Sequence, residues 1–346
     1  MPEKQDATFH LPYESKIEVS SMDAYSLLIS NLLSPIALAF LVGMLATWVK
    51  SELEFPQPVL NAISIYLVFA IALKGGTELA AADLAAVIKP VLAALFLALA
   101  LPCIAFGVAR KVLRLGIPDA AGLAALYGSV SSVTFLAAMS FAAKAGTPAE
   151  PVMLVLVSVM EWGILVALFI ARWATARASA TGAALPLKDI VMDTLKGRSV
   201  ILMLGGLGMG YVIGEKGFAS VKIVFEDAFR GILVLFLLEM GMVAARQMKG
   251  FRENGIRLLA FGILTPLCHG AIGVAVGNLA GLSVGGSFVL GAMAGSASYI
   301  DAPAAVRAAL PTANPGIYLT SSLGVTFPFN LLVGIPLLYS FAVWLG

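Results

Sequence analysis

The sequence predicts an all-α membrane protein of ten transmembrane helices in two inverted five-helix repeats. Three observations lead to this fold class: the overall hydrophobicity, the length of the apolar stretches, and a Gly-Ser-x-Ser segment in each half. Of the 346 residues, 60% are hydrophobic and 12% are charged, and the mean hydropathy is +0.96. A soluble protein could not cover such a chain with water-compatible surface. The net charge of +2 is small and its cations are dispersed, so we expect no nucleic-acid partner.

The apolar stretches are long enough to cross about 30 Å of hydrocarbon. Before them, residues 1–25 form a polar segment without a signal-peptide core, which predicts a solvated N-terminal tail. The first repeat (26–173) and the second repeat (199–346) flank a linker at 174–198 that contains Gly182 and Pro186. In chain order, the predicted helices cover 26–49, 59–79, 90–109, 119–143, 151–173, 199–214, 228–246, 255–277, 284–309 and 316–345.

The Lys and Arg residues of the connecting segments predict the orientation. Connections after the odd-numbered helices carry fourteen of them, whereas the opposite side carries six, so the positive-inside rule places the first set in the cytoplasm. Both termini are then expected outside the cytoplasm. The protein itself is expected in the inner (plasma) membrane.

The repeat is visible as an ungapped alignment of 128–138 on 295–305, at an offset of 167 residues. Because each half has an odd number of helices, the second half must enter the membrane with opposite polarity. This architecture favours alternating access.

The two aligned segments predict an anion site. Gly and Ser are unfavourable within a helix, which indicates that the fourth and ninth helices are broken there, with N–H groups and half-helix N-termini directed at one point. The alternative is close helix packing through small residues. The candidate substrate-binding residues are Gly128, Ser129, Ser131, Ser132, Thr134, Gly295, Ser296 and Ser298.

Ionisable and polar residues within the helices predict a cation site, because a charge in the bilayer must be compensated. Glu161 is either a sodium ligand or a protonated structural residue. Asp301, three residues after Ser298, is either a ligand or a helix-capping residue. Thr326 and Asn330, which flank Pro328, offer neutral oxygens of the kind that sodium prefers, or else bond between helices.

Lys74 and Glu239 occupy nearly equivalent repeat positions and are predicted to form a structural ion pair. The sequence contains no Walker loop, Rossmann fingerprint or His-Glu-x-x-His motif. We therefore expect no enzyme, no cofactor and no metal beyond sodium.

With these residues in view, the chain resembles the sodium-dependent bicarbonate transporter (SbtA) family. The matching segments are Lys74-Gly75-Gly76-Thr77-Glu78-Leu79, 127–135, 295–300 with Pro303-Ala304-Ala305, and Val325-Thr326-Phe327-Pro328-Phe329-Asn330. The resemblance implies a gate domain of helices 1, 2, 6 and 7, a mobile core of helices 3–5 and 8–10, bicarbonate between helices 4 and 9, and an elevator motion in a homotrimer.

Three features depart from the family pattern. Trp162-Gly163 replaces the Ser-Pro that follows the Met-Glu pair, Asp301 replaces an apolar residue, and the linker at 174–198 is shorter. In cyanobacterial members the corresponding loop is associated with a PII-like regulatory protein, so the resemblance raises such a partner as a possibility.

The expected function is sodium-coupled import of bicarbonate. The alternatives are sodium- or proton-coupled transport of another small anion, such as a short carboxylate, and a transport-inactive anion receptor or scaffold.

Overall fold

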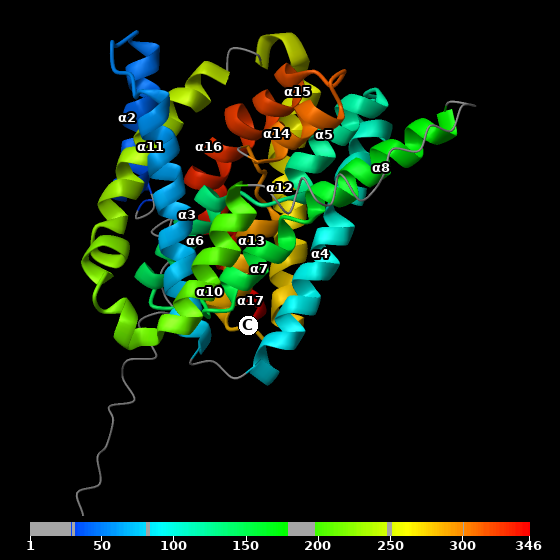
Figure 1. Cartoon of the computed structure of the whole chain (residues 1–346). Coiled ribbons are helices and arrows are strands. Elements are labelled where there is room, and N and C mark those ends of the chain that lie inside the picture. Colours follow the sequence, from blue (N-terminus) through cyan, green and yellow to red (C-terminus); the bar gives the residue numbers. More distant parts are fainter. Residues whose placement is uncertain (1–28, 30–31, 81–83, 179–197, 248–250, 300) are drawn as a thin grey trace, which may run out of the picture.

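The computed structural model describes residues 29, 32–80, 84–178, 198–247, 251–299 and 301–346 (Figure 1). The predicted tail and most of the predicted linker lie outside these ranges. Within them, every regular element is a helix.

The first half contains two consecutive long helices, of 24 and 28 residues, and otherwise shorter ones. They are α2 (Pro35–Trp48), α3 (Gln57–Ala80), α4 (Leu84–Lys111), α5 (Ile117–Gly128), α6 (Ser132–Lys144), α7 (Met153–Met160) and α8 (Gly163–Ala178). The second half contains α10 (Arg198–Phe218), η3 (Ile223–Asp227), α11 (Phe229–Gln247), α12 (Phe251–Leu279), α13 (Val284–Ala294), α14 (Asp301–Ala309), α15 (Pro315–Leu319), η5 (Thr320–Thr326), α16 (Phe327–Phe329), η6 (Asn330–Gly334) and α17 (Ile335–Leu345), where η marks π-helices.

In the described part of the chain, seven helical segments are long and apolar enough to cross a membrane. Each matches one predicted helix, so the chain is a multi-pass membrane protein. The segments are Gln57–Thr77, Val87–Lys111, Ile117–Lys144, Met153–Thr175, Ile223–Arg246, Gly255–Leu279 and Pro315–Leu345. The other three predicted helices fall on α2, on α10 and on the pair α13 and α14.

Both Gly-Ser-x-Ser segments interrupt a helix, as the sequence predicted. Helix α5 ends at Gly128 and α6 begins at Ser132, while Ser129 and Ser131 have extended backbone conformations. Helix α13 ends before Gly295, and the next helix begins at Asp301.

The predicted helix at 151–173 is also divided, which the sequence did not predict. Glu161 and Trp162 separate α7 from α8, and the N–H groups of Trp162 and Ile164 donate three residues back, to Val159 and Glu161. The helix is therefore wound more tightly at Glu161 than an α-helix.

The C-terminal helix, Pro315–Leu345, has the opposite distortion. Two π-helical segments, η5 and η6, flank Pro328. Proline has no N–H and its ring collides with the carbonyl four residues earlier, so the hydrogen-bond ladder widens on both sides of it. All seven residues of η5 are buried.

Two close helix pairs occupy one side of the molecule, with α2 and α11 at the left in Figure 1. In the first pair a Cβ atom on Gly43 of α2 would lie 1.8 Å from the carbonyl oxygen of Leu238, so only glycine allows this approach. In the second pair a Cβ on Gly210 of α10 would lie 2.0 Å from the carbonyl oxygen of Leu73 in α3. Small residues permit such backbone contact in membranes.

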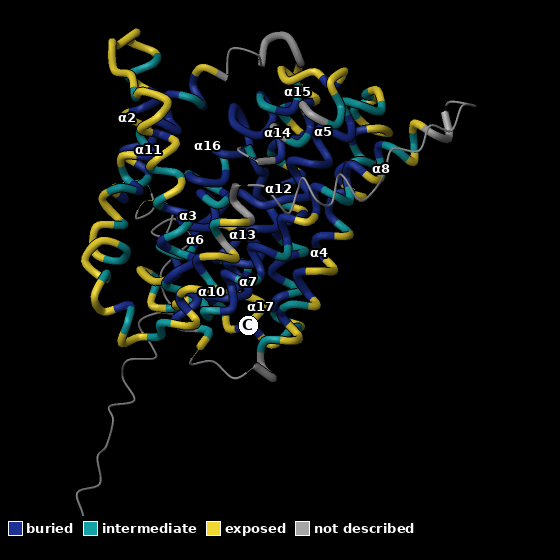
Figure 2. The backbone as a smooth tube through the Cα atoms, in the orientation of Figure 1, coloured by how far each residue is buried: buried dark blue, intermediate teal, exposed yellow. Residues whose placement is uncertain are grey.

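The remaining helices pack around the two interrupted ones. Figure 2 shows buried residues concentrated around α13 and α14, with exposed residues along the outer sides of α2 and α11. Two contacts join the halves at helix starts: Glu150 Oε1 accepts from Ser283 N–H at the start of α13 (2.5 Å), and Asp119 Oδ1 accepts from Asn314 N–H at the start of α15 (2.7 Å). Carboxylates stabilise these helix N-termini.

Candidate functional site

The two Gly-Ser-x-Ser segments, which come from different halves of the chain, lie in direct contact. The N–H of Ser131 donates to Ser296 Oγ (2.8 Å), and the N–H of Ser298 donates to the carbonyl oxygen of Leu126 (2.8 Å). The Leu126 carbonyl is one of the last four of α5, which have no intrahelical partner. Each broken helix therefore supplies hydrogen-bond partners to the other.

Each segment leads into the N-terminus of a half-helix. Ser131 Oγ caps α6 by accepting from Thr134 N–H (3.1 Å), and Ser298 Oγ accepts from Ala302 N–H (3.4 Å) in the first turn of α14. The first N–H groups of a helix lack internal acceptors and carry a partial positive charge. Two electropositive helix ends thus begin at the contact between the segments, an arrangement that can stabilise an anion.

The predicted substrate-binding residues share one buried environment. All are buried except Ser132, which is half-buried. The Ser296 hydroxyl donates to the carbonyl oxygen of Met293 (2.7 Å) while accepting from Ser131 N–H. In this structure Ser296 therefore holds the two segments together.

Glu161 contacts the first of these segments. Ser129 Oγ donates to Glu161 Oε2 at 2.6 Å, and the two residues are both 2% exposed. A predicted cation ligand and a predicted anion ligand are therefore hydrogen-bonded to each other.

Gly163 explains how the helix bearing Glu161 comes so close to Ser129. A Cβ atom on Gly163 would lie 1.7 Å from the carbonyl oxygen of Gly128. Any other residue would push α8 away from the end of α5. Gly163 in the Trp162-Gly163 pair thus allows α8 to approach the end of α5 closely. The bulky Trp162 side chain is 46% exposed.

Asn330 and Thr326, on the C-terminal helix, have different partners. Asn330 Nδ2 donates to the carbonyl oxygen of Gly295 (2.7 Å) and so contacts the second segment. Thr326 Oγ1 donates to the carbonyl oxygen of Gly262 (2.6 Å) in α12. That carbonyl needs a partner because residue 266, four positions later, is proline and has no N–H.

Tyr127 is a residue that the sequence reasoning missed. Its fully buried hydroxyl lies 2.6 Å from Ser321 Oγ and 2.5 Å from Thr326 Oγ1. Its sequence signals were its place directly before the first Gly-Ser-x-Ser segment and its inclusion in the family-matching segment 127–135. Both of its partners come from the other half of the chain, so the sequence did not indicate the contact.

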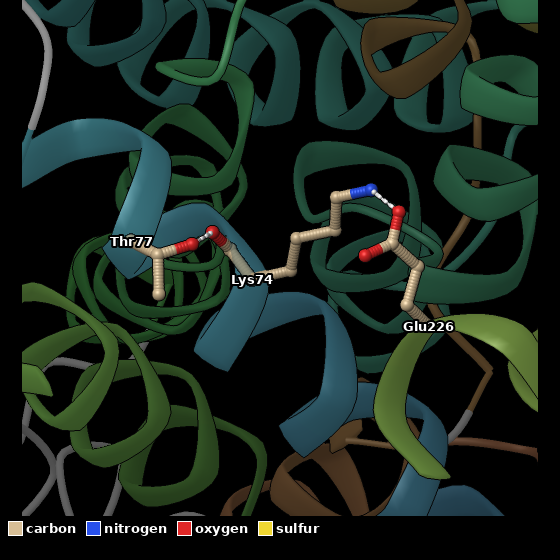
Figure 3. Close-up of polar contacts among 3 residues, drawn as sticks. All are labelled: Lys74, Thr77 and Glu226. Carbon is tan, nitrogen blue, oxygen red and sulfur yellow. Dashed lines mark hydrogen bonds and ion pairs between the residues drawn. The ribbon is translucent and has the colours of Figure 1, made fainter. Parts of the chain in front are cut away.

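The predicted ion pair between Lys74 and Glu239 is wrong. Figure 3 shows that Lys74 Nζ binds Glu226 Oε1, at 2.8 Å, while the Lys74 carbonyl accepts from Thr77 Oγ1 (2.6 Å). Glu239 lies more than three helical turns after Glu226 in the chain, which corresponds to about 20 Å of helix rise. The π-helical turn η3 brings Glu226 to α3 instead, and Phe225 packs there against Tyr66 and Phe69.

Glu239 is instead buried on α11 with 3% of its surface exposed, and its Oε2 atom has no hydrogen-bond partner in the described part of the protein. Asp301 is the first residue of α14, but its side chain lies outside the described residues. Its backbone position, at a helix N-terminus, suits a carboxylate.

Comparison with known protein families gives one match that covers most of the chain. A model of the Na+-dependent bicarbonate transporter superfamily matches residues 35–343. This range contains both Gly-Ser-x-Ser segments, Glu161 and nearly all of the C-terminal helix. No curated protein matched the chain.

Proposed function

The chain belongs to the Na+-dependent bicarbonate transporter superfamily, and on this premise we propose that it is a sodium-coupled symporter that imports bicarbonate by an elevator-type alternating-access mechanism. The observation that carries the proposal is the 2.6 Å hydrogen bond from Ser129 Oγ to Glu161 Oε2. It joins the residue types needed for anion binding and for cation binding at one buried point.

Electrostatic repulsion at this hydrogen bond would couple the binding of the anion to the binding of sodium. An ionised Glu161 would repel an anion held at the Ser129–Ser131 segment by roughly 3 kcal/mol, for two charges about 5 Å apart at an effective dielectric constant of 20. A sodium ion bound to the Glu161 carboxylate would cancel that repulsion. Anion binding would then depend on prior sodium binding.

The Ser129 hydroxyl adds a second effect. A hydroxyl has one proton, and that proton is directed at Glu161 in this structure. A cation on the carboxylate would compete for the same oxygen, which would leave the Ser129 proton free to turn toward the anion. Sodium would thus both neutralise the site and supply a hydrogen-bond donor.

Asp301 is proposed as a second charge that distinguishes this chain. A carboxylate at the start of α14 stays ionised near the anion only if a cation neutralises it; otherwise it is protonated, or it caps the helix away from the anion. These roles differ in the number of charges moved per anion and in the pH dependence of uptake.

Several contacts support the proposed inverted repeats. Ser131 and Ser298, 167 residues apart, each accept a hydrogen bond from the first turn of the following half-helix. The pairing of α2 with α11 and of α3 with α10 is the arrangement that a two-fold axis between the halves would generate, because helices 1 and 6 and helices 2 and 7 are the proposed equivalents.

The same pairing supports a division into two bodies. The proposed gate contains α2, α3, α10 and α11, and the proposed mobile core contains the helices around the two segments. We further propose that gates associate into a homotrimer in the inner membrane, with both termini outside the cytoplasm. Cross-linking and accessibility labelling of the termini test these points.

Tracer uptake into proteoliposomes tests the proposed function directly. We expect labelled bicarbonate to accumulate when an inward sodium gradient is present and to stop accumulating when potassium replaces sodium. Competition by formate, acetate and nitrate tests whether another small anion is preferred. Bicarbonate flux that is indifferent to sodium would overturn the proposal.

A further inference from the structure

A buried chain of hydroxyl groups connects the first Gly-Ser-x-Ser segment to the C-terminal helix. The direction of its hydrogen bonds follows from the number of protons available. Thr326 donates its only hydroxyl proton to the carbonyl oxygen of Gly262. Tyr127 must then donate to Thr326, and Ser321 must donate to Tyr127. Every hydroxyl in this chain therefore donates once, with Tyr127 in the middle.

The surroundings of Tyr127 make this arrangement rigid. The side chain is fully buried, and its ring packs edge-to-face against Phe261 of α12, with centroids 4.9 Å apart. Tyr127 is the penultimate residue of α5, directly before Gly128 and the non-helical Ser129. Anything that fixes Tyr127 also fixes where the first segment begins.

The C-terminal helix fixes the second segment as well. Asn330, one helical turn beyond Thr326, donates to the carbonyl oxygen of Gly295. One helix thus holds the start of both segments, through the Tyr127 hydroxyl on one side and the Asn330 amide on the other. The spacing between two anion-binding segments determines whether both can reach the same anion.

We infer that Tyr127 is a positioning residue for the anion site. Its hydroxyl sets the position of the Gly128–Ser131 segment relative to the Gly295–Ser298 segment by anchoring α5 to the C-terminal helix. The role in anion affinity rests on the proposed function, whereas the anchoring itself does not.

Tyr127→Phe tests the inference because it removes the hydroxyl and leaves the ring. The chain supplies a matched control in Tyr318, which is equally buried in the same apolar cluster but whose hydroxyl has no hydrogen-bond partner in the described part of the protein. We expect Tyr127→Phe to raise the half-saturating bicarbonate concentration roughly three- to tenfold, the loss of about one hydrogen bond. The maximal rate should change little, and Tyr318→Phe should leave both parameters as in the wild type.

Hydrogen–deuterium exchange of the purified protein tests the anchoring without transport. Peptides covering 129–135 should exchange faster in Tyr127→Phe than in the wild type or in Tyr318→Phe. If Tyr127→Phe accumulates poorly, Thr326→Val and Thr326→Ser replace it: loss of the hydroxyl should raise exchange in 129–135, and serine should restore it.

The outcomes separate the two proposals. Faster exchange in Tyr127→Phe, together with a wild type that moves no bicarbonate, would support the anchoring and contradict the proposed function. Unchanged exchange and an unchanged half-saturating concentration in Tyr127→Phe would overturn the inference, even if the wild type transports bicarbonate.

Discussion

Ser129 Oγ donates a 2.6 Å hydrogen bond to Glu161 Oε2, and both residues are almost completely buried. Ser129 belongs to the interruption between α5 and α6, and Glu161 to the interruption between α7 and α8. Two distortions in separate helices therefore meet at one polar contact in a membrane-embedded region. A buried polar pair of this kind is costly to keep unless its groups satisfy each other or a ligand.

Replacing Glu161 by glutamine should weaken sodium binding. Loss of a charge-assisted ligand costs about 1.5–3 kcal/mol, so we expect the half-saturating sodium concentration for uptake to rise about ten- to a hundredfold. Glu226→Gln serves as the control, because Glu226 binds Lys74 at a different place. An unchanged sodium dependence in Glu161→Gln would assign Glu161 a structural role.

Replacing Ser296 by alanine should lower anion affinity and stability together. The variant leaves the buried Ser131 N–H without its acceptor, which typically costs about 1–3 kcal/mol. The matched variant Ser340→Ala removes a hydroxyl whose one hydrogen bond within the described residues goes to the carbonyl oxygen of Pro336 in the same helix. Thermal unfolding measures the stability, and tracer uptake measures the anion affinity. Equal values of both in the two variants would show that the contact between the segments contributes little to either.

Replacing Gly163 by alanine should destabilise the protein strongly, because the new Cβ would collide with the Gly128 carbonyl oxygen. Forcing such helices apart typically costs about 1–3 kcal/mol. Gly107→Ala is the control, because a Cβ there meets nothing within 4 Å beyond the neighbouring backbone of its own helix, and alanine favours the helix. A thermal unfolding temperature for Gly163→Ala equal to that of Gly107→Ala would refute the close approach.

A double-mutant cycle should distinguish the observed ion pair from the one predicted from sequence. Lys74→Met combined with Glu226→Gln should show a coupling energy of only about 0.2–1 kcal/mol, since both side chains are about one-third or more exposed. Lys74→Met combined with Glu239→Gln should be additive. Coupling in the second cycle but not in the first would reverse the assignment.

The sequence by itself determined the membrane class, seven of the helical segments, and the two interruptions at the Gly-Ser-x-Ser segments. Hydropathy and helix propensity are properties of consecutive residues, and they act through the length of an apolar stretch or the local cost of Gly and Ser. The break at Glu161 could not be predicted in this way because the sequence around it is apolar and compatible with a helix. Its nearest visible signal was Gly163, whose role depends on a carbonyl 35 positions earlier.

Only the tertiary structure decided which polar groups satisfy one another. Lys74 pairs with Glu226 because a π-helical turn places that carboxylate beside α3, and repeat symmetry alone had suggested Glu239. Tyr127 reaches Ser321 and Thr326 across 194 and 199 positions of sequence. Within a bilayer no water can satisfy a buried polar group, so these donors take the acceptors that folding brings within about 3 Å, whatever their distance along the chain.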